Sequence, residues 1–157
     1  MNESLDRYIS VNNFSIRYRE LGNGMPLILV HGIAGFLEEW ESAMNLLCKK
    51  YRVIALDLPG HGLSDKPDIS YTLDFLAVIL KDFIQDVSEE KIYLAGHSLG
   101  GAICLNFAIK YPHLVDRLII VNSAFVKIPL KIRLGSFVFL PKLTKLIRKI
   151  PMFIVKS

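Results

Sequence analysis

A serine between two glycines is the arrangement in this chain that points most clearly to chemistry. The segment Gly96-His97-Ser98-Leu99-Gly100 follows a short apolar run and precedes a helical pattern. At a sharp turn from a strand into a helix, a serine projects its hydroxyl above the sheet, and Gly96 and Gly100 omit the side chains that would collide there. The helix N-terminus adds free N–H groups and a partial positive charge. The pattern therefore predicts that Ser98 is a nucleophile beside a site that stabilises negative charge.

A second loop could supply the other half of such a site. The segment His31-Gly32-Ile33-Ala34-Gly35 directly follows the apolar run from Pro26 to Val30. An oxyanion formed at Ser98 needs preorganised N–H donors, and we expect the backbone N–H groups of Ile33 and Leu99 to be these two donors. Five further residues are expected to support the site rather than to react: His31, Gly32, Gly96, His97 and Gly100.

Alternating apolar strands and amphipathic helices must position both loops. Two short β-type runs near the start of the chain flank Asn12-Asn13, which is typical of a hairpin turn. Buried strands and helices then alternate, which predicts an α/β fold whose mostly parallel sheet carries helices on both faces. The expected strands are 8–11, 14–20, 26–30, 51–58, 91–95 and 114–121, and the expected helices are 38–50, 72–87 and 99–111.

Three motifs together resemble the α/β-hydrolase family. They are His31-Gly32-x-x-Gly35, Asp57-Leu58-Pro59-Gly60-His61-Gly62-x-Ser64 and Gly96-His97-Ser98-Leu99-Gly100-Gly101, in the family's order and after the expected strands. The resemblance covers roughly residues 8–122 and implies that Ser98 is the nucleophile, with Ile33 and Leu99 donating to the oxyanion. It also implies that an ester, thioester, amide or carbon–carbon bond is cleaved. The family's dehalogenases and epoxide hydrolases carry aspartate in place of this serine, which argues against those two activities.

The chain does not offer a base and an acid where the family has them. The family places an acid and then a histidine after the nucleophile, whereas this chain has His113 followed by Asp116. A helix over residues 99–111 would carry both about 20 Å from Ser98. A general base must come within about 3 Å of the proton that it removes. We therefore expect neither residue to reach the serine.

The other candidates for acid–base chemistry have structural interpretations. The side chain of His97 is expected to point away from the serine because the turn is sharp. His31 and His61 are expected to order their loops, and Asp57 to pin the turn over residues 60–64. Some members of the family place the acid after the strand that ends at residue 121, but Asn122 and Ser123 stand there.

Composition excludes several other classes of protein. Hydrophobic residues make up 52% and charged residues 22%, which indicates one globular domain with a substantial core. No apolar run reaches 18 residues, and the first ten residues are not a secretory signal. Cys48 and Cys104 lie in apolar patterns without metal-ligand spacing, so we expect buried thiols, a cytoplasmic location, no metal and no cofactor. Residues 1–122 carry a net charge of −4 and no nucleic-acid motif, so no nucleic-acid partner is expected.

The end of the chain differs from the rest. Residues 123–157 carry a net charge of +8, and basic residues alternate with apolar ones over 129–156. We predict an α/β-hydrolase core over residues 1–122 and the start of a basic, amphipathic helical cap over 123–157. Contact of residues 129–156 with a membrane surface and a disordered remnant are the alternatives. Without later strands, residues 118–121 would form an exposed hydrophobic edge through which the chain could self-associate.

Two functions remain open. The first is a serine hydrolase of the esterase, lipase or thioesterase type, which acts on a small-molecule acyl substrate through Ser98 but needs a further acid and histidine. The second is a non-catalytic, truncated or degenerate relative that binds a small acyl ligand or a partner. Ser98-dependent turnover by the chain alone would distinguish the two.

Overall fold

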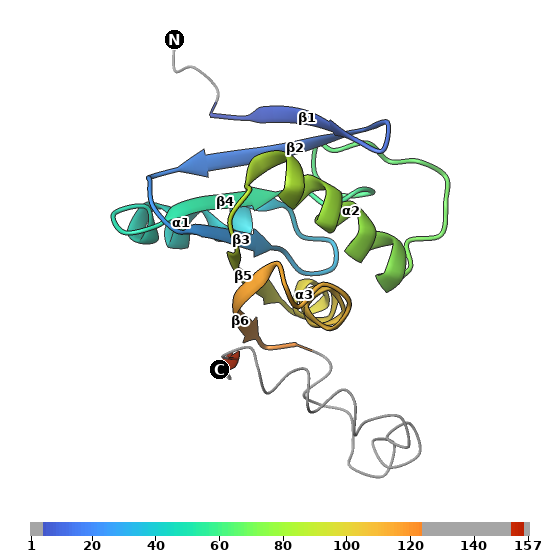
Figure 1. Cartoon of the computed structure of the whole chain (residues 1–157). Helices are drawn as coiled ribbons and strands as arrows, with labels where there is room; N and C mark the ends of the chain where they lie inside the picture. The colour runs from blue at the N-terminus through green and yellow to red at the C-terminus, as the bar shows by residue number, and fades with distance from the viewer. Residues whose placement is uncertain (1–4, 124–151, 156–157) are drawn as a thin grey trace, which may run out of the picture.

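A computed structural model describes residues 5–123 and 152–155 of this 157-residue chain. The elements are β1 (Arg7–Val11), β2 (Phe14–Leu21), β3 (Pro26–Val30), the 3-10 helix η1 (Leu37–Trp40), α1 (Glu41–Leu47), β4 (Arg52–Leu56), α2 (Leu73–Val87), β5 (Ile92–His97), α3 (Leu99–Lys110), β6 (Val115–Val121) and β7 (Met152–Val155). They build an α/β fold with a mostly parallel sheet, which confirms the fold class predicted from the sequence (Figure 1).

One sheet of seven strands organises the molecule, in the order β1-β2-β4-β3-β5-β6-β7. The first two strands pair antiparallel with each other, and β2 also pairs antiparallel with β4. From β4 to β7 every neighbouring pair is parallel. All five residues of the central strand β3 are buried, as a strand covered on both faces requires.

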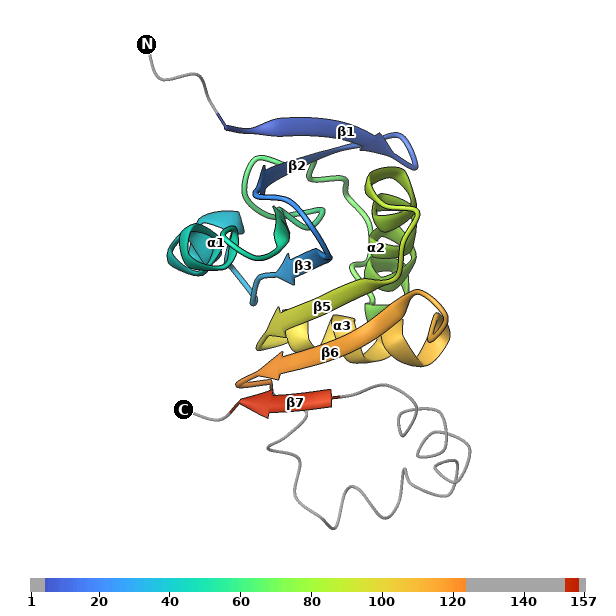
Figure 2. The same ribbon diagram turned by 60° about the vertical axis from the view of Figure 1, so that its left-hand side comes forward.

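Helices cover the two faces of the sheet. Alternate residues of a strand point to opposite faces. Ile28 and Val30 accordingly belong to the core formed with α2 and α3, whereas Leu27 and Leu29 belong to a smaller core formed with η1 and α1. Figure 2 shows α1 on one side of the strands and the other two helices on the opposite side. The sheet is thus held at both faces, which fixes the loops at its carboxyl end.

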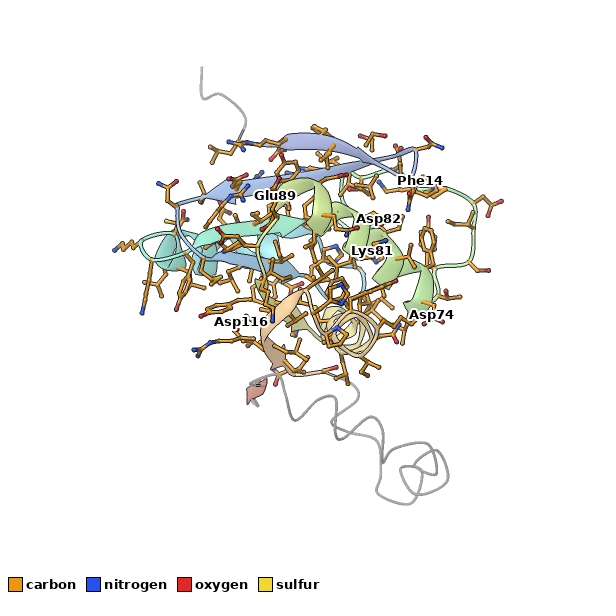
Figure 3. The ribbon with its side chains drawn as sticks, viewed as in Figure 1. Phe14, Asp74, Lys81, Asp82, Glu89 and Asp116 are labelled. Atoms are coloured by element: carbon orange, nitrogen blue, oxygen red, sulfur yellow. The ribbon has the colours of Figure 1, made fainter. Side chains whose placement is uncertain are left out.

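The first hairpin turns as predicted and packs on α2. Asn12 and Asn13 have φ values of 49° and 66°, the two positive angles of a type I′ turn. The Asn12 side chain donates a hydrogen bond to Asp82 of α2 at 2.7 Å. The rings of Phe14 and Phe75 meet edge to face, with centroids 6.1 Å apart. Figure 3 shows Phe14 and Asp82 at this junction between hairpin and helix.

The helix α2 begins at Leu73 because Thr72 is its N-cap. The Thr72 hydroxyl accepts a hydrogen bond from the Phe75 N–H at 3.1 Å, which satisfies one of the free donors of the first turn. Asp74, in the same turn, accepts from Asn106 at 2.9 Å and pairs with Lys110 at 2.7 Å. These contacts join α2 to α3, the helix that follows the serine.

No helix of the described residues is long and apolar enough to cross a membrane.

Two sequence-based predictions need correction. The helix expected over residues 38–50 begins one residue earlier as the 3-10 helix Leu37–Trp40 and continues as α1 only to Leu47. The strand 118–121 is not an open edge, because β7 pairs with it in parallel register from Leu118↔Met152 to Val121↔Val155. A strand therefore lies inside the segment expected to form a helical cap. Residues 124–151, the bulk of that segment, lie outside the described residues.

Candidate active site

Ser98 sits at the apex of the turn between β5 and α3. Its backbone has φ 51° and ψ −114°, a conformation that costs a residue other than glycine about 1–3 kcal/mol. Neighbouring groups hold it there. The Ser98 N–H donates to the carbonyl of Val121 at 3.0 Å, and the hydroxyl of buried Ser123 donates to the Ser98 carbonyl at 3.1 Å. The turn predicted from the glycine spacing is thus formed, and the end of β6 holds it in place.

The flanking glycines are needed for close backbone contacts. A Cβ at Gly96 would collide with the carbonyl of Gly100, across the turn. A Cβ at Gly100 would collide with the carbonyls of Val30 and His31, at the end of β3. Both positions therefore require glycine, and the start of α3 lies directly against the second loop of the predicted site.

The loop after β3 forms a tight turn beside the serine. The Gly35 N–H donates to the Gly32 carbonyl at 3.1 Å, and Ala34 has φ 56°, which together describe a type II turn with Ile33 at its first central position. A Cβ at Gly32 would lie 3.3 Å from the Ser98 Cβ. The structure therefore places the loop that holds Ile33 next to the serine, and Leu99 begins α3 on the other side.

His31 is a buried structural group. It is fully buried, its Nδ1 lies 2.7 Å from the Gly32 carbonyl, and its Nε2 accepts a hydrogen bond from the Leu58 N–H at 3.1 Å. The acceptor role of Nε2 requires the proton to be on Nδ1, which then donates to Gly32. Burial lowers the pKa of His31, so the ring is held neutral. It links the loop after β3 to the segment after β4 and has no free nitrogen for Ser98.

Asp57 and His61 also have the structural contacts expected from the sequence. Asp57 is fully buried and accepts from the N–H groups of Leu37 at 2.7 Å and Leu63 at 2.8 Å. The second bond pins the turn after β4. Nδ1 of the His61 ring lies 3.2 Å from the Pro59 carbonyl oxygen. Neither side chain contacts Ser98.

None of the four histidines of the chain, all of which lie within residues 5–123, is hydrogen-bonded to the Ser98 hydroxyl. His97 pairs through Nδ1 with Glu39, and the contacts of His31 and His61 are structural. His113 and Asp116 lie at the opposite end of the sheet, because Val115, between them in the sequence, pairs with Ile92 at the start of β5. The register between β5 and β6 shifts by one residue at Asp116, which is labelled in Figure 3. The described residues therefore bring together a serine and two loops, but no base.

Two residues near the serine could not be found by sequence reasoning. Glu39 accepts from the Gly32 N–H at 3.2 Å and lies 2.5 Å from Nδ1 of His97, although 58 residues separate it from His97. Ser123 supports the Ser98 carbonyl from the end of β6. Neither belongs to a local motif, so only the tertiary fold shows the roles of these side chains.

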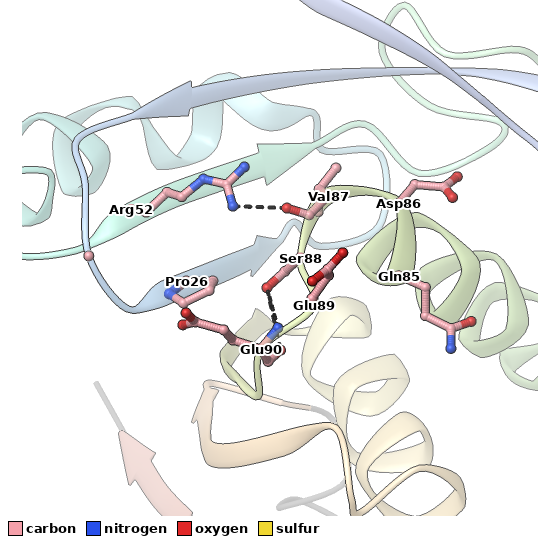
Figure 4. A pocket seen from close by; sticks show the side chains of 9 residues that line it. Pro26, Arg52, Gln85, Asp86, Val87, Ser88, Glu89 and Glu90 are labelled. Carbon is pink, nitrogen blue, oxygen red and sulfur yellow. Dashed lines mark hydrogen bonds between the residues drawn. The ribbon is translucent and has the colours of Figure 1, made fainter.

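A pocket in the described part of the chain lies away from the serine. It has a volume of about 460 Å³ and is bounded by Pro26 and Arg52, at the amino ends of β3 and β4, and by the end of α2 (Figure 4). Arg52 donates to the Val87 carbonyl at 2.8 Å and to Glu20 at 2.7 Å, so its charge is already paired. Ser98 follows the carboxyl end of β5, so this pocket and the candidate site lie at opposite ends of the sheet.

Comparison with known proteins gives the same fold. A sequence profile described as alpha/beta hydrolase fold matches residues 25–150. A 2-hydroxy-6-oxo-6-(2'-aminophenyl)hexa-2,4-dienoic acid hydrolase of Metapseudomonas resinovorans is 36% identical over 76% of this chain and 43% of that protein. Epoxide hydrolase 4 of Mus musculus is 35% identical over 73% of this chain and 34% of its own length.

A solved structure matches this chain at a comparable sequence identity. The crystal structure of a bacterial membrane phospholipase A superposes with a TM-score of 0.74 and 33% identity, over 76% of this chain and 39% of that one. This chain therefore spans less than half the length of the relatives that it matches. The profile covers most of the chain. The chain belongs to the alpha/beta hydrolase fold family.

Proposed function

We propose that this chain carries the nucleophile and the oxyanion site of a serine hydrolase that cleaves an acyl bond in a small-molecule substrate. The observation that carries the proposal is the backbone of Ser98, which is held at φ 51° at the start of α3 with the Gly32 turn beside it. Acyl transfer needs preorganised N–H donors beside the nucleophile, and a serine at the start of a helix with a second loop next to it supports this proposal.

The proposed reaction has two steps. The Ser98 oxygen attacks the substrate carbonyl carbon while its proton passes to a base, and the resulting oxyanion accepts hydrogen bonds from the Ile33 and Leu99 N–H groups. The tetrahedral intermediate then expels the leaving group, which takes the proton from the base. Water, deprotonated by the same base, hydrolyses the acyl-serine and restores Ser98.

Serine favours an acyl substrate over an epoxide, although epoxide hydrolases are among the relatives. Attack of a serine on an epoxide carbon would form an ether, which water does not hydrolyse under mild conditions. An aspartate at the same place would form an ester, which water can cleave. Only an acyl group leaves a serine in a form that can turn over, and this supports esterase-type or carbon–carbon bond hydrolysis.

The described residues supply no base to the Ser98 hydroxyl, so the proposal requires a base from elsewhere in the protein. The four histidines are all accounted for, and none meets the Ser98 hydroxyl. We infer that the acid and histidine belong to chain that follows β7, as in a protein of the length of the relatives. A chain without them would be the second candidate, a non-catalytic member of the family that binds an acyl ligand at the oxyanion loop.

The surroundings of the site are proposals too. We expect residues 124–151 to form the start of a cap that turns apolar residues toward Ser98, with contact to an anionic lipid surface as the alternative. Both cysteines are free thiols, Cys104 buried and Cys48 partly so, and burial raises the pKa of the Cys104 thiol. Unpaired cysteines are typical of a reducing compartment, which supports a cytoplasmic location.

A fluorophosphonate probe tests the proposed nucleophile. The probe should attach to Ser98 in a protein that continues past β7 to a histidine, and peptide mapping by mass spectrometry would locate the adduct. The Ser98→Ala variant is the control and should not be labelled. A fully folded protein of that length whose Ser98 stays unmodified, or which is labelled equally after Ser98→Ala, would reject the proposal.

A further inference from the structure

A single carboxylate joins the two loops of the candidate site. Glu39 lies in η1, and its Oε2 accepts a hydrogen bond from the Gly32 N–H at 3.2 Å. Its Oε1 lies 2.5 Å from Nδ1 of His97. Gly32 directly precedes Ile33 in the oxyanion loop, and His97 directly precedes Ser98. One side chain therefore spans the gap between the two halves of the site.

The backbone around Glu39 is built to hold this carboxylate. A Cβ at Gly35 would lie 2.6 Å from the Glu39 Oε2, so the loop leaves room for the carboxylate only because this residue is glycine. The start of η1 is anchored in turn, because the Leu37 N–H donates to buried Asp57 at 2.7 Å. Glu39 thus projects from a fixed base, and its two contacts are not those of a mobile surface side chain.

The pairing also sets which nitrogen of the His97 ring carries a proton toward Glu39. A carboxylate only accepts hydrogen bonds, so the proton of the neutral ring must lie on Nδ1, and Nε2 is left without one. Hydrogen bonds to an ionised carboxylate are about twice as strong as those between neutral groups. The ring and the loop are therefore held by the same charged group.

We propose that Glu39 is a positioning residue that holds the oxyanion loop against the serine turn. This positioning role rests on the proposed function, in which the Ile33 and Leu99 N–H groups bind the oxyanion. Gly32 is one residue from Ile33, and His97 is two residues from Leu99, so the bridge sets how far apart the two donors lie. Donors misplaced by about 1 Å lose most of their effect on the oxyanion.

Nuclear magnetic resonance of the labelled chain tests the bridge without any need for activity. In Glu39→Gln, the amide can still accept from Gly32, but it can meet the His97 Nδ1 only as a donor. The ring proton should therefore move from Nδ1 to Nε2, which ring-nitrogen shifts detect. In Glu39→Ala, exchange of the Gly32 amide proton should rise by about tenfold or more, and the Ile33 and Leu99 amide signals should shift. Glu41→Gln and Glu41→Ala, two residues along on the exposed start of α1, are the matched controls and should leave all these signals unchanged.

The outcomes separate this inference from the proposed function. An unchanged His97 proton in Glu39→Gln, or unchanged Gly32, Ile33 and Leu99 signals in Glu39→Ala, would overturn the positioning role. In a longer protein whose Ser98 reacts with the fluorophosphonate, Glu39→Ala should slow labelling by about a hundredfold at an unchanged melting temperature, and an unchanged rate would also overturn it. Absence of labelling in the wild type would reject the nucleophile alone, because the bridge is read from the resonance signals.

Discussion

At the scale of single residues, the site depends on side chains that do not react. His31 has both ring nitrogens occupied, and its neutral form links the loop after β3 to the Leu58 N–H. Glu39 holds the same loop from the other side through Gly32. A loop of small residues cannot pack itself tightly, so hydrogen bonds from outside must fix its conformation. Polar side chains near Ser98 therefore serve the geometry of the site.

The lowered pKa of His31 predicts that acid weakens the fold. Above a pH of about 6.5 the ring is neutral in both the folded and the unfolded chain. Below it the unfolded chain binds a proton that the buried ring resists, so the free energy of unfolding should fall by up to about 1.4 kcal/mol per pH unit. The carboxylates with shifted pKa values all shift downward, below this window: Asp6, Glu20, Glu38, Asp74 and Asp82.

Urea unfolding between pH 7 and pH 5 measures this slope. The His31→Gln variant should be less stable at pH 7, because the Gly32 and Leu58 bonds are disturbed, but its stability should fall less between pH 6.5 and 5. Equal slopes for wild type and variant would show that His31 is not the group responsible.

At the scale of elements, a buried charge network anchors the strand and the 3-10 helix behind the site. Arg17 of β2 is 4% exposed and pairs with Asp6 at 2.8 Å, with Asp57 at 3.1 Å and with Glu38. Burial alone would lower the pKa of Arg17, but the hydrogen bonds to the three carboxylates raise it above its usual value. Since Glu38 belongs to η1 and Asp57 accepts from the Leu37 N–H at 2.7 Å, this network holds the helix that carries Glu39.

Removal of the buried cation should be far more harmful than removal of an exposed one. Arg17→Met would leave the carboxylate of Asp57 buried without its partner charge, and we expect a loss of about 3–5 kcal/mol in the free energy of unfolding. Arg7→Met is the matched control, because Arg7 of β1 is 57% exposed in its pair with Glu20 and should cost less than about 1 kcal/mol. Urea denaturation compares the two, and similar losses would contradict the network's structural role.

β7 covers the edge of β6 and is itself the outermost strand of the described sheet. β7 pairs with β6 from Leu118 to Val121, which would otherwise present free N–H and carbonyl groups along a largely apolar strand. A chain that ends at Pro151 lacks this strand and should self-associate at tens of micromolar, which sedimentation velocity would detect. The same distribution of species for this chain and for the 157-residue chain would contradict the prediction.

At the scale of the whole molecule, local patterns predicted the core of the fold and missed what depends on distant contacts. The bounds of β3 and the Asn12-Asn13 turn follow from a buried apolar run and from residues that tolerate positive φ. β7 was missed because a four-residue apolar run after Pro151 carries no sign of the partner strand 34 residues earlier. The Glu39 bridge was missed for the same reason.

The residues of the candidate site likewise fall into those that local patterns predict and those that depend on distant contacts. Ser98 and its glycines could be predicted because the turn needs those residues at that spacing, which the structure reproduces. Ser123 could not, since a serine after a strand has no distinguishing pattern, and only the Ser98 carbonyl at 3.1 Å gives it a role. Within residues 5–123 no histidine is hydrogen-bonded to the Ser98 hydroxyl: His113 lies beyond the end of α3, and the contacts of the other three histidines are with other groups.

Hydrolysis of p-nitrophenyl butyrate tests most directly whether the molecule holds a prepared serine without its base. The 157-residue chain should hydrolyse the ester no faster than its Ser98→Ala variant. A protein that continues past β7 to an acid and a histidine should exceed its own Ser98→Ala variant by about a thousandfold or more. Ser98-dependent turnover by the 157-residue chain alone, or its absence from the folded longer protein, would contradict the account.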